Sequence, residues 1–368
     1  MKTHVSMNKE AQLAFDTLRH LISSPNIRKS FETLIHSFLN ANGNPRPEHA
    51  KAKSSSAISR MLNQYQLPAR LILKTVRAII GKLIWQYFSN SKKRRPKLEL
   101  IIDLTTLEKT GEFENLPLSY FNEKYGLHVV VLYVVIGNQR FPWAIRLWRG
   151  KGQTTWTQHA LSMLRCIPSW FTERFICQVK ADTGFGNNEF IEGCSAMGLP
   201  LVVGIPCDRK TEQGWRLEQL KVQGGVLMLN GCSVPVYVAR YKLWHKKGTF
   251  EWRYVLSTVG AEAKTIIRHG KRRWRIEAFF KTMKSRFGLD QFGQRTLTGV
   301  LRFFLIAFIA YLLTFWTSPP LGDEENPNWI ALAREAQLWL VTWVVAFELA
   351  VASEQLNEVL KQKALVVS

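Results

Sequence analysis

Residues 98–205 alternate between extended and helical patterns, and this alternation limits the fold more than any other feature of the chain. The segments LELIIDLTTL and GLHVVVLYVVIGNQRFPWAIRLWRG predict three consecutive strands, the last two joined as a hairpin at Gly137-Asn138. The next segments predict a helix at residues 154–171, a strand at 174–182, a short helix at 187–198 and a buried strand at 199–206. This order indicates a mixed α/β fold.

Two aspartates follow strand patterns in this region. The first strand is expected to end near Asp103, and the strand in RFICQVKAD is expected to end at Asp182. In open α/β sheets, ligands bind beside the carboxyl ends of strands. Both side chains are therefore candidates for a functional site. The alternative is a local role, Asp103 as a cap of the strand-to-loop turn and Asp182 in an Asx-turn.

A third carboxylate stands in the most basic stretch of the chain. KRRWRIEAFFKTMKSRFG, residues 271–288, contains Glu277 among seven basic side chains. Such neighbours keep a carboxylate ionised, which suits the binding of a cation better than the transfer of a proton. Arg273, Glu277 and Lys284 fall within about 40° of one another around a helix of 3.6 residues per turn. The alternative is that Glu277 only pairs with Arg273 or Lys281 at i,i+4 spacing.

Three carboxylates without histidine or cysteine ligands suit a hard, oxygen-preferring cation, Mg²⁺ or Mn²⁺. Two such ions, roughly 4 Å apart, can activate a water or a 3′-hydroxyl and stabilise the leaving oxygen in phosphoryl transfer. We predict that Asp103, Asp182 and Glu277 are the catalytic residues and the ligands of two ions. Arg273 and Lys284 are predicted to bind the phosphates that flank the scissile bond.

The net charge indicates the kind of substrate. Lys and Arg number 50 against 28 Asp and Glu, which gives a formal charge of +22 at pH 7. An excess of this size favours a polyanion partner, nucleic acid first and an anionic membrane second. We expect Arg275 and Lys281, in the basic stretch, to contact DNA phosphates. The run SKKRRPK, residues 91–97, is either a solvated linker or a linker that also touches DNA.

Two apolar runs raise the question of a membrane span. Residues 303–316 fall short of the roughly 20 residues that a bilayer core requires, and residues 338–352 are interrupted by Glu348. We therefore predict two buried helices and no membrane partner. The N-terminus is polar where a signal peptide needs an apolar core. The five cysteines lack metal-site spacing and are expected to be reduced. A cytoplasmic protein is the expectation.

At these residues the sequence resembles DDE transposases of the bacterial insertion-sequence-four type, over about residues 98–316. That family carries the signature Tyr-x2-Arg-x3-Glu-x6-Lys. GKRRWRIEAFFKTMK matches it at Arg273, Glu277 and Lys284, with Gly270 in place of the tyrosine. The segments IDLTTLEKTG and ADTGFGNNEF resemble the family's blocks around its two aspartates.

The resemblance implies a ribonuclease H-like catalytic domain with a β-rich insertion before the last catalytic helix. Such an insertion accounts for the 95 positions between Asp182 and Glu277 (277 − 182). The resemblance also places Thr106 and Lys109 near Asp103, where we expect them to contact DNA.

The activity implied by the resemblance is cut-and-paste transposition. Such an enzyme binds the terminal inverted repeats of double-stranded DNA, cleaves at the element ends with metal-activated water and joins the 3′-hydroxyls to target DNA. A homodimer in a synaptic complex, associated with the bacterial nucleoid, is expected. Two alternatives remain open. One is a metal-dependent nuclease of the same fold without strand transfer, and the other is an inactive DNA-binding descendant, which Gly270 allows.

The β-rich stretch holds three tryptophans among basic residues, Trp215, Trp244 and Trp252. They either pack a small core of the insertion or present at least one ring that stacks on a base flipped out near the cleaved end.

We divide the chain into five segments by these patterns. They are a helical basic DNA-binding region with its linker (residues 1–96), the first part of the catalytic domain (97–206), the β-rich insertion (207–260), the last part of the catalytic domain with the catalytic helix (261–316), and a helical tail (317–368). We expect residues 1–96 to bind the element ends without the catalytic domain.

Overall fold

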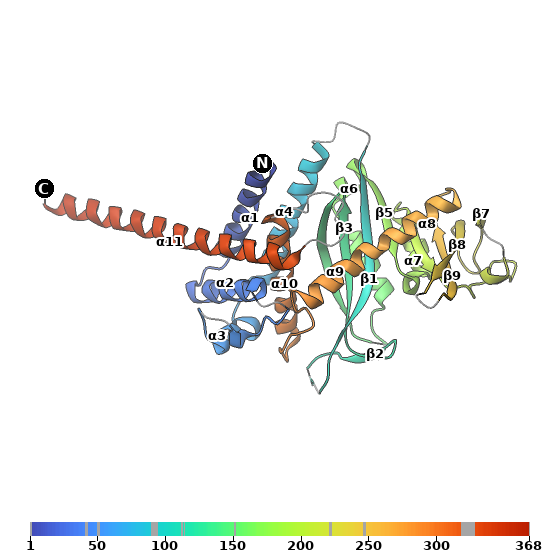
Figure 1. The fold of residues 1–368 in the computed structure, drawn as a ribbon, viewed down its shortest axis with the longest axis horizontal. Coiled ribbons are helices and arrows are strands. Elements are labelled where there is room, and N and C mark those ends of the chain that lie inside the picture. Colours follow the sequence, from blue (N-terminus) through green and yellow to red (C-terminus); the bar gives the residue numbers. More distant parts are fainter. Residues whose placement is uncertain are drawn as a thin grey trace. The chain divides into compact units, whose positions relative to one another are not determined.

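Figure 1 shows the fold in a computed structural model of the chain. The structure describes residues 2–40, 43–49, 52–89, 95–111, 113, 115–150, 152–220, 223–245, 248–317 and 328–367. The chain forms two compact units. The helical unit consists of Met1–Val76 and Thr282–Ser368, and the sheet unit consists of Arg77–Lys281.

The sheet unit is built around β1 (Lys97–Glu108), which has a partner on each side. β3 (Lys124–Ile136) runs antiparallel to β1, and β4 (Gln139–Trp148) runs antiparallel to β3. β5 (Ile176–Ala181) runs parallel to β1, and β6 (Leu201–Ile205) runs parallel to β5. The order β4-β3-β1-β5-β6 is the mixed sheet of a ribonuclease H-like domain, so the predicted fold class is confirmed.

The hairpin between β3 and β4 was predicted correctly, and the end of β1 was not. The hairpin is confirmed, because Ile136 pairs with Gln139 across a two-residue loop and Gly137 adopts φ 55°, a conformation open to glycine. The predicted end of the first strand near Asp103 is wrong. β1 continues to Glu108, because the long strand β3 remains paired with it over its whole length.

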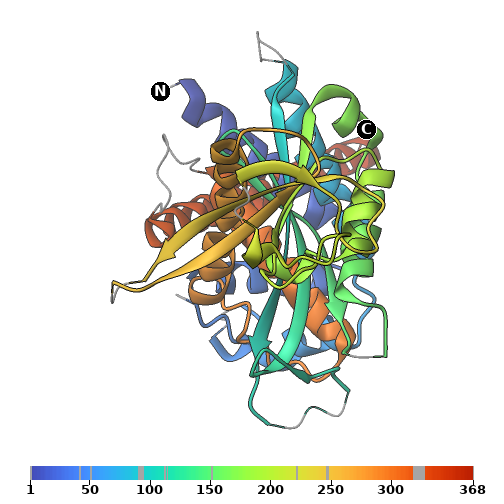
Figure 2. The ribbon, with the colours of Figure 1, turned by 90° about the vertical axis from the view of Figure 1, so that its right-hand side faces the viewer.

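The strands of the β-rich stretch continue the same sheet. β9 (Phe250–Ser257) pairs with β6, β8 (Val236–Trp244) pairs with β9, and β7 (Gln223–Leu227) lies at the edge. β2 (Ser119–Phe121) pairs with β3 near the other edge. Figure 2 shows β8 and β9 as paired arrows that project beyond the neighbouring strands.

Helices α5 (Trp156–Arg165) and α6 (Ser169–Arg174) lie between β4 and β5, and α7 (Asn188–Ala196) connects the parallel strands β5 and β6. The single helix predicted at 154–171 is two helices, because Pro168 has no N–H to donate and favours extended backbone in the residue before it. α5 begins with a capping box in which Thr155 and Gln158 exchange side-chain and backbone hydrogen bonds.

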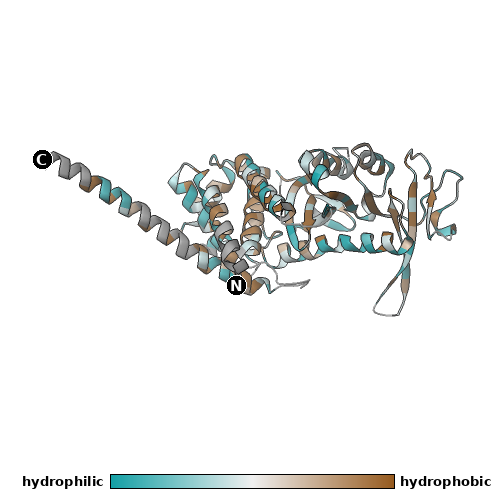
Figure 3. Cartoon of the chain, turned by 90° about the horizontal axis from the view of Figure 1, so that it is seen from above, coloured by the Kyte–Doolittle hydropathy of each residue, from teal (hydrophilic) through white to brown (hydrophobic). Residues whose placement is uncertain are grey.

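Three consecutive helical segments follow β9 and return across the sheet. They are α8 (Ala263–Lys271), the 3-10 turn η4 (Arg272–Trp274) and α9 (Arg275–Ser285), of which residues up to Lys281 belong to the sheet unit. Figure 1 shows α8 and α9 as one rod that crosses the strands. In Figure 3 this rod carries more hydrophilic colour than the strands beside it, as its basic sequence requires.

The helical unit packs around α10 (Leu297–Thr317). α1 (Lys2–His20), α2 (Pro25–Asn40), α3 (Ser55–Asn63) and α11 (Trp329–Val367) all contact α10. The 3-10 turn η1, at Pro47–His49, precedes α3. α4 (Ala69–Ser89) starts in this unit and continues into the sheet unit, and Pro68 lies between α3 and α4.

One helix among the described residues, Leu297–Trp316, is long and apolar enough to cross a membrane by length and composition. Within its most apolar window, 78% of the residues are buried. Its side chains pack on the unit's other helices: the rings of Phe38 and Phe303 lie 4.9 Å apart, and Arg302 donates to the carbonyl oxygens of Met61 and Leu62 at 3.0 Å each. These contacts are those of a core helix.

Candidate active site

The two aspartates lie on neighbouring parallel strands of the sheet unit. Ile102 of β1 is in register with Ala181, the last residue of β5. Asp103 is therefore the first residue of β1 beyond the part that pairs with β5, and Asp182 follows directly as the N-cap of the turn Thr183–Phe185. Since parallel strands end at the same edge, this register places the two carboxylates at one edge of the β1–β5 pair.

The helix rod brings Glu277 to the same place through Arg273. One Arg273 nitrogen, Nη1, lies 3.1 Å from Asp103 Oδ2. The other, Nη2, lies 2.8 Å from Glu277 Oε1 and 3.5 Å from Asp182 Oδ1. A single guanidinium thus contacts three carboxylates that are distant in the sequence. Asp182 lies 79 positions after Asp103, and Glu277 lies 95 positions after Asp182. Their role as metal ligands stays a prediction.

The three carboxylates differ in their exposure. The Asp103 side chain is 11% exposed and accepts a hydrogen bond from the Leu104 N–H at 2.9 Å, whereas Asp182 and Glu277 are 49% and 48% exposed. Burial raises the pKa of Asp103 to about 7, even though the adjacent Arg273 acts to lower it. Asp182 and Glu277 are therefore the two carboxylates that solvent reaches.

Arg273 is bound firmly within this cluster. Burial acts to lower the pKa of Arg273, but Asp182, Asp103 and Glu277 outweigh it and raise the pKa above its usual value. The contact with phosphate that the sequence suggested for Arg273 stays a prediction.

The oxygen donors of the three carboxylates suit a divalent metal, and in this structure Arg273 is the cation that they contact. Carboxylate oxygens are what Mg²⁺ and Mn²⁺ prefer. Among the residues that the structure describes, however, no group of three or more His, Cys, Asp or Glu side chains is placed to hold a metal ion. Asp103, Asp182 and Glu277 are instead each engaged by Arg273.

A second charged cluster, which the sequence reading missed, lies beneath the first. Glu99, on β1, is 5% exposed, and its carboxylate contacts three cations. They are Lys180 at 2.6 Å, Arg272 at 3.1 Å and Arg275 at 3.3 Å. Burial acts to raise the pKa of Glu99, but these cations outweigh it and hold the pKa below its usual value. The sign of this cluster in the sequence is Glu99 itself, an acidic residue at a buried position of the largely apolar strand segment LELIID.

The other predicted phosphate-binding residues have varied surroundings. Thr106 Oγ1 lies 2.9 Å from His128 Nδ1, and the backbone N–H of Lys109 donates to the Tyr125 carbonyl at 3.2 Å. Lys281 is exposed on α9. Lys284 is on the same helix but belongs to the helical unit. The structure does not assign any of them a phosphate contact, and these roles stay predictions.

The basic run before β1 is only partly described. Residues 91–94 lie outside the described residues. Arg95 donates hydrogen bonds to the carbonyl oxygens of Thr172 and Phe175, the latter at 2.8 Å. This arginine therefore ties the start of β1 to the end of α6, and DNA contact by the rest of the run stays a prediction.

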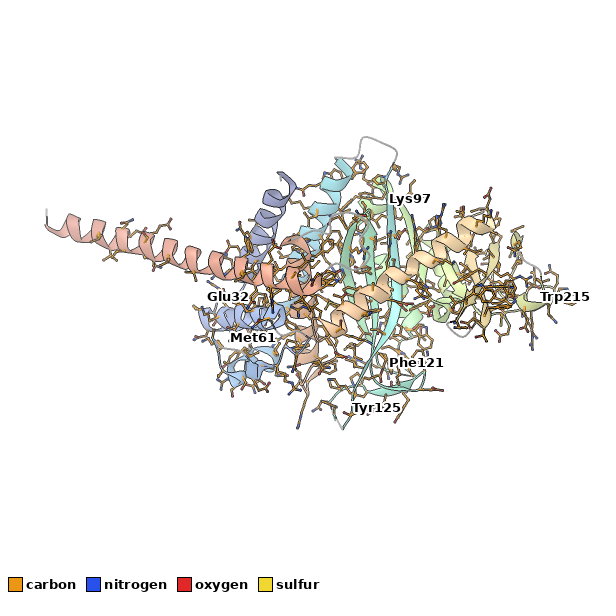
Figure 4. All side chains as sticks on the ribbon, in the orientation of Figure 1. Glu32, Met61, Lys97, Phe121, Tyr125 and Trp215 are labelled. Atoms are coloured by element: carbon orange, nitrogen blue, oxygen red, sulfur yellow. The ribbon has the colours of Figure 1, made fainter. Side chains whose placement is uncertain are left out.

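The three tryptophans of the β-rich stretch are exposed and do not pack a core. Trp215, Trp244 and Trp252 are 57%, 62% and 41% exposed. Figure 4 labels Trp215 at the outer end of the sheet unit. Two cations lie over rings of the β8–β9 hairpin: Arg240 is 4.5 Å from the Trp252 centroid, and Lys242 is 4.2 Å from that of Phe250.

This hairpin therefore presents aromatic faces and positive charge together. Lys246 and Lys247, which join β8 to β9 in the sequence, lie outside the described residues. Stacking on a flipped base stays a prediction.

Gly270, at the position of the signature tyrosine, allows α8 to lie close to β9. A Cβ at this residue would come within 2.8 Å of Val255 Cγ1 and 3.1 Å of its Cγ2. The packing of α8 on the sheet thus leaves no room for a larger side chain at Gly270. Nearby in the sequence, His269 Nδ1 lies 3.2 Å from the Gln178 amide, and Trp274 is 50% exposed. A role for either residue in place of the tyrosine stays a prediction.

Gly270→Tyr is expected to destabilise the protein instead of repairing the signature. The stiff, β-branched Val255 cannot make room, so we expect the free energy of unfolding to fall by about 1–3 kcal/mol or more. Denaturant unfolding measures this change. The matched control is Gly225→Ala, where an added Cβ meets no atom within 4 Å and the change should stay within about 0.5 kcal/mol. A Gly270→Tyr variant as stable as the wild type would contradict the packing argument.

One hollow lies elsewhere in the sheet unit. It has a volume of about 490 Å³ and is lined by α4, β4 and the loop from α5 to α6, with Trp85, Trp143 and Trp170 among its walls. None of its lining residues belongs to either charged cluster.

Comparison with models of protein families matches residues 94–313 to the transposase DDE domain. No curated protein matches the chain. Among solved structures, the chain is similar to a piggyBac transposase in a synaptic complex with hairpin DNA, determined by cryo-EM. The sequence identity is 10%, the TM-score is 0.48, and the alignment covers 90% of this chain and 77% of that chain. Because the family match spans more than half of the chain, the protein belongs to the transposase DDE domain family and is an enzyme that acts on DNA.

Proposed function

We propose that this transposase is of the insertion-sequence-four type and carries out cut-and-paste transposition, cleaving DNA at the ends of a mobile element and joining the freed 3′-hydroxyls to target DNA. The observation that carries the proposal is the convergence of Asp103, Asp182 and Glu277 on one guanidinium. Asp103 lies on β1, Asp182 directly follows β5, and Glu277 lies on α9. The sequence segments around them resemble the family's blocks around its three acidic residues.

Transposases of this family generally use divalent metal ions. In our proposal, Asp103, Asp182 and Glu277 would hold two Mg²⁺ or Mn²⁺ ions, which when bound activate the attacking oxygen and stabilise the leaving oxygen. The protein contributes the orientation of these ligands. The Leu104 N–H holds one Asp103 oxygen, and Arg273 holds the other.

DNA binding rests on cations around this site. The formal charge of +22 supplies long-range attraction to DNA, and exposed Lys281 lies one turn along α9 from Glu277. In the proposal, Lys281 and Lys284 contact phosphates beside the scissile bond. At least one of the exposed rings of Trp215, Trp244 and Trp252 stacks on a base flipped out near the cleaved end.

We also propose how the protein assembles on DNA and where in the cell it acts. Residues 1–96 contribute to binding of the terminal inverted repeats, and two copies of the chain join two ends in a synaptic complex. The proposed setting is the bacterial cytoplasm, at the nucleoid. Support for DNA as the partner comes from the family match and the positive charge.

Strand transfer is the activity that separates this proposal from its alternatives. The experiment incubates the purified protein and Mg²⁺ with two DNA substrates. One is a duplex containing the sequence that flanks the gene, and the other is the same end already cleaved, offered together with a plasmid target. Cleavage of the first and joining of the second are expected. Cleavage without joining would indicate a nuclease, and binding without either reaction would indicate an inactive descendant.

A further inference from the structure

The Glu99 cluster links the sheet to the helix that carries Glu277. Glu99 and Asp103 are four residues apart on β1, so their side chains leave the same face of the strand, about 13 Å apart along it. Lys180 lies near the end of β5, and Asp182, two residues further on, follows the strand. One buried ion pair, Glu99 with Lys180, therefore lies beneath the pair of aspartates.

The segment from η4 to α9 contacts both the buried Glu99 and the aspartates, through arginines that are close together in the sequence. Arg272 and Arg275 reach the Glu99 carboxylate, one to each oxygen, at 3.1 Å from Oε1 and 3.3 Å from Oε2. Arg273, which lies between them in the sequence, reaches Asp103 instead. A helix that turned or slid by one residue would lose all three contacts together.

We infer that Glu99 is a positioning residue, which fixes the rotation and register of the η4–α9 segment over β1 and thereby places Glu277 beside Asp103 and Asp182. This inference rests on the proposed function of the carboxylates. Glu99 does not touch the reacting DNA. It acts through Arg272 and Arg275, which would repel Lys180 and each other if the carboxylate were removed.

Three arginines of the basic stretch are engaged within the protein. Arg272, Arg273 and Arg275 all have carboxylate partners within the protein. These three arginines therefore serve to dock the helix on the sheet, whatever additional contact they make with DNA.

The test compares Glu99→Gln with Glu108→Gln. Glu108 is on the same strand, but its side chain is 61% exposed and pairs with Lys124 at the surface. Cleavage by the wild-type chain is measured first, with kcat and KM determined for each variant. For Glu99→Gln we expect kcat to fall by about tenfold to a hundredfold with KM for DNA little changed, because a misplaced catalytic group slows the reaction without weakening phosphate contacts. Glu108→Gln should match the wild type, and Glu99→Asp should recover part of kcat.

Hydrogen exchange supplies a readout that does not require activity. Amides of residues 263–281 should exchange faster in Glu99→Gln than in Glu108→Gln, because the clamp on the helix is lost. If the wild-type chain does not cleave DNA, the proposed function fails, and this comparison still decides the positioning role. Equal exchange, or equal kcat for the two variants, would overturn the inference.

A double variant covers the case in which Glu99→Gln does not fold. Glu99→Leu with Lys180→Met replaces the buried ion pair by apolar side chains, a change that is often tolerated. It should fold and still show reduced kcat and faster exchange of residues 263–281, because Arg272 and Arg275 remain without their partner. Full recovery of kcat and of protection in this variant would show that Glu99 serves only to neutralise Lys180.

Discussion

Asp103→Asn should abolish DNA cleavage, with a loss of about a thousandfold or more, since metal-assisted charge stabilisation supplies several kcal/mol and each 1.36 kcal/mol is tenfold in rate. The substitution keeps the size of the side chain and removes the charge that we propose holds the metal. Asp182→Ala and Glu277→Ala are expected to have effects of the same order. Gel-based cleavage of an end-containing duplex measures the loss.

Binding to DNA supplies the control for this prediction. Affinity rests on lysine and arginine contacts to phosphate, so each variant should bind an end duplex within about tenfold of the wild type at the same salt concentration. Asp208→Ala, which removes an exposed acid of the loop after β6, should cleave normally. Near wild-type cleavage by any one of the three carboxylate variants would remove that residue from the proposed site.

A fragment of residues 1–96 is expected not to fold by itself, contrary to its predicted action without the catalytic domain. Helices α1, α2 and α3 bury their apolar faces on α10, whose sequence lies more than 200 positions after α3. Without α10, side chains such as Phe15, Phe38 and Met61, all 0% exposed, lose the surface that covers them. Circular dichroism of the fragment should show little cooperative helix.

The full-length chain provides the matching test of this core. Phe303→Ala removes a ring that is 1% exposed and packs on Phe38, so the free energy of unfolding should fall by about 3–5 kcal/mol. Leu301→Ala, at a position of α10 that is 38% exposed, should change it by less than about 1 kcal/mol. A fragment of residues 1–96 that unfolds cooperatively, or equal effects of the two substitutions, would argue against α10 as the centre of the unit.

The local patterns of the sequence were sufficient for most of the sheet unit. Alternating apolar residues predicted strands β1, β3 and β4, and the Gly137-Asn138 pair predicted the hairpin, because strand and turn preferences depend on neighbouring residues. Pattern reading was less accurate for the end of β1. The strand continues past Asp103 because β3 supplies a partner for it, which no property of LELIIDLTTL reveals.

The sequence by itself determined which three carboxylates to consider, since Asp103, Asp182 and Glu277 each stand in a recognisable local pattern. Only the tertiary structure decided how they are held. Arg273 reaches all three, and Glu99 meets Arg272, 173 positions away, because the helix rod folds back across the strands. The same holds for the helical unit, where the two ends of the chain share one core. Periodicity records only which face of an element is apolar or charged. The choice of partner for that face depends on burial and charge contributed by distant segments, and it is settled only when the chain has folded.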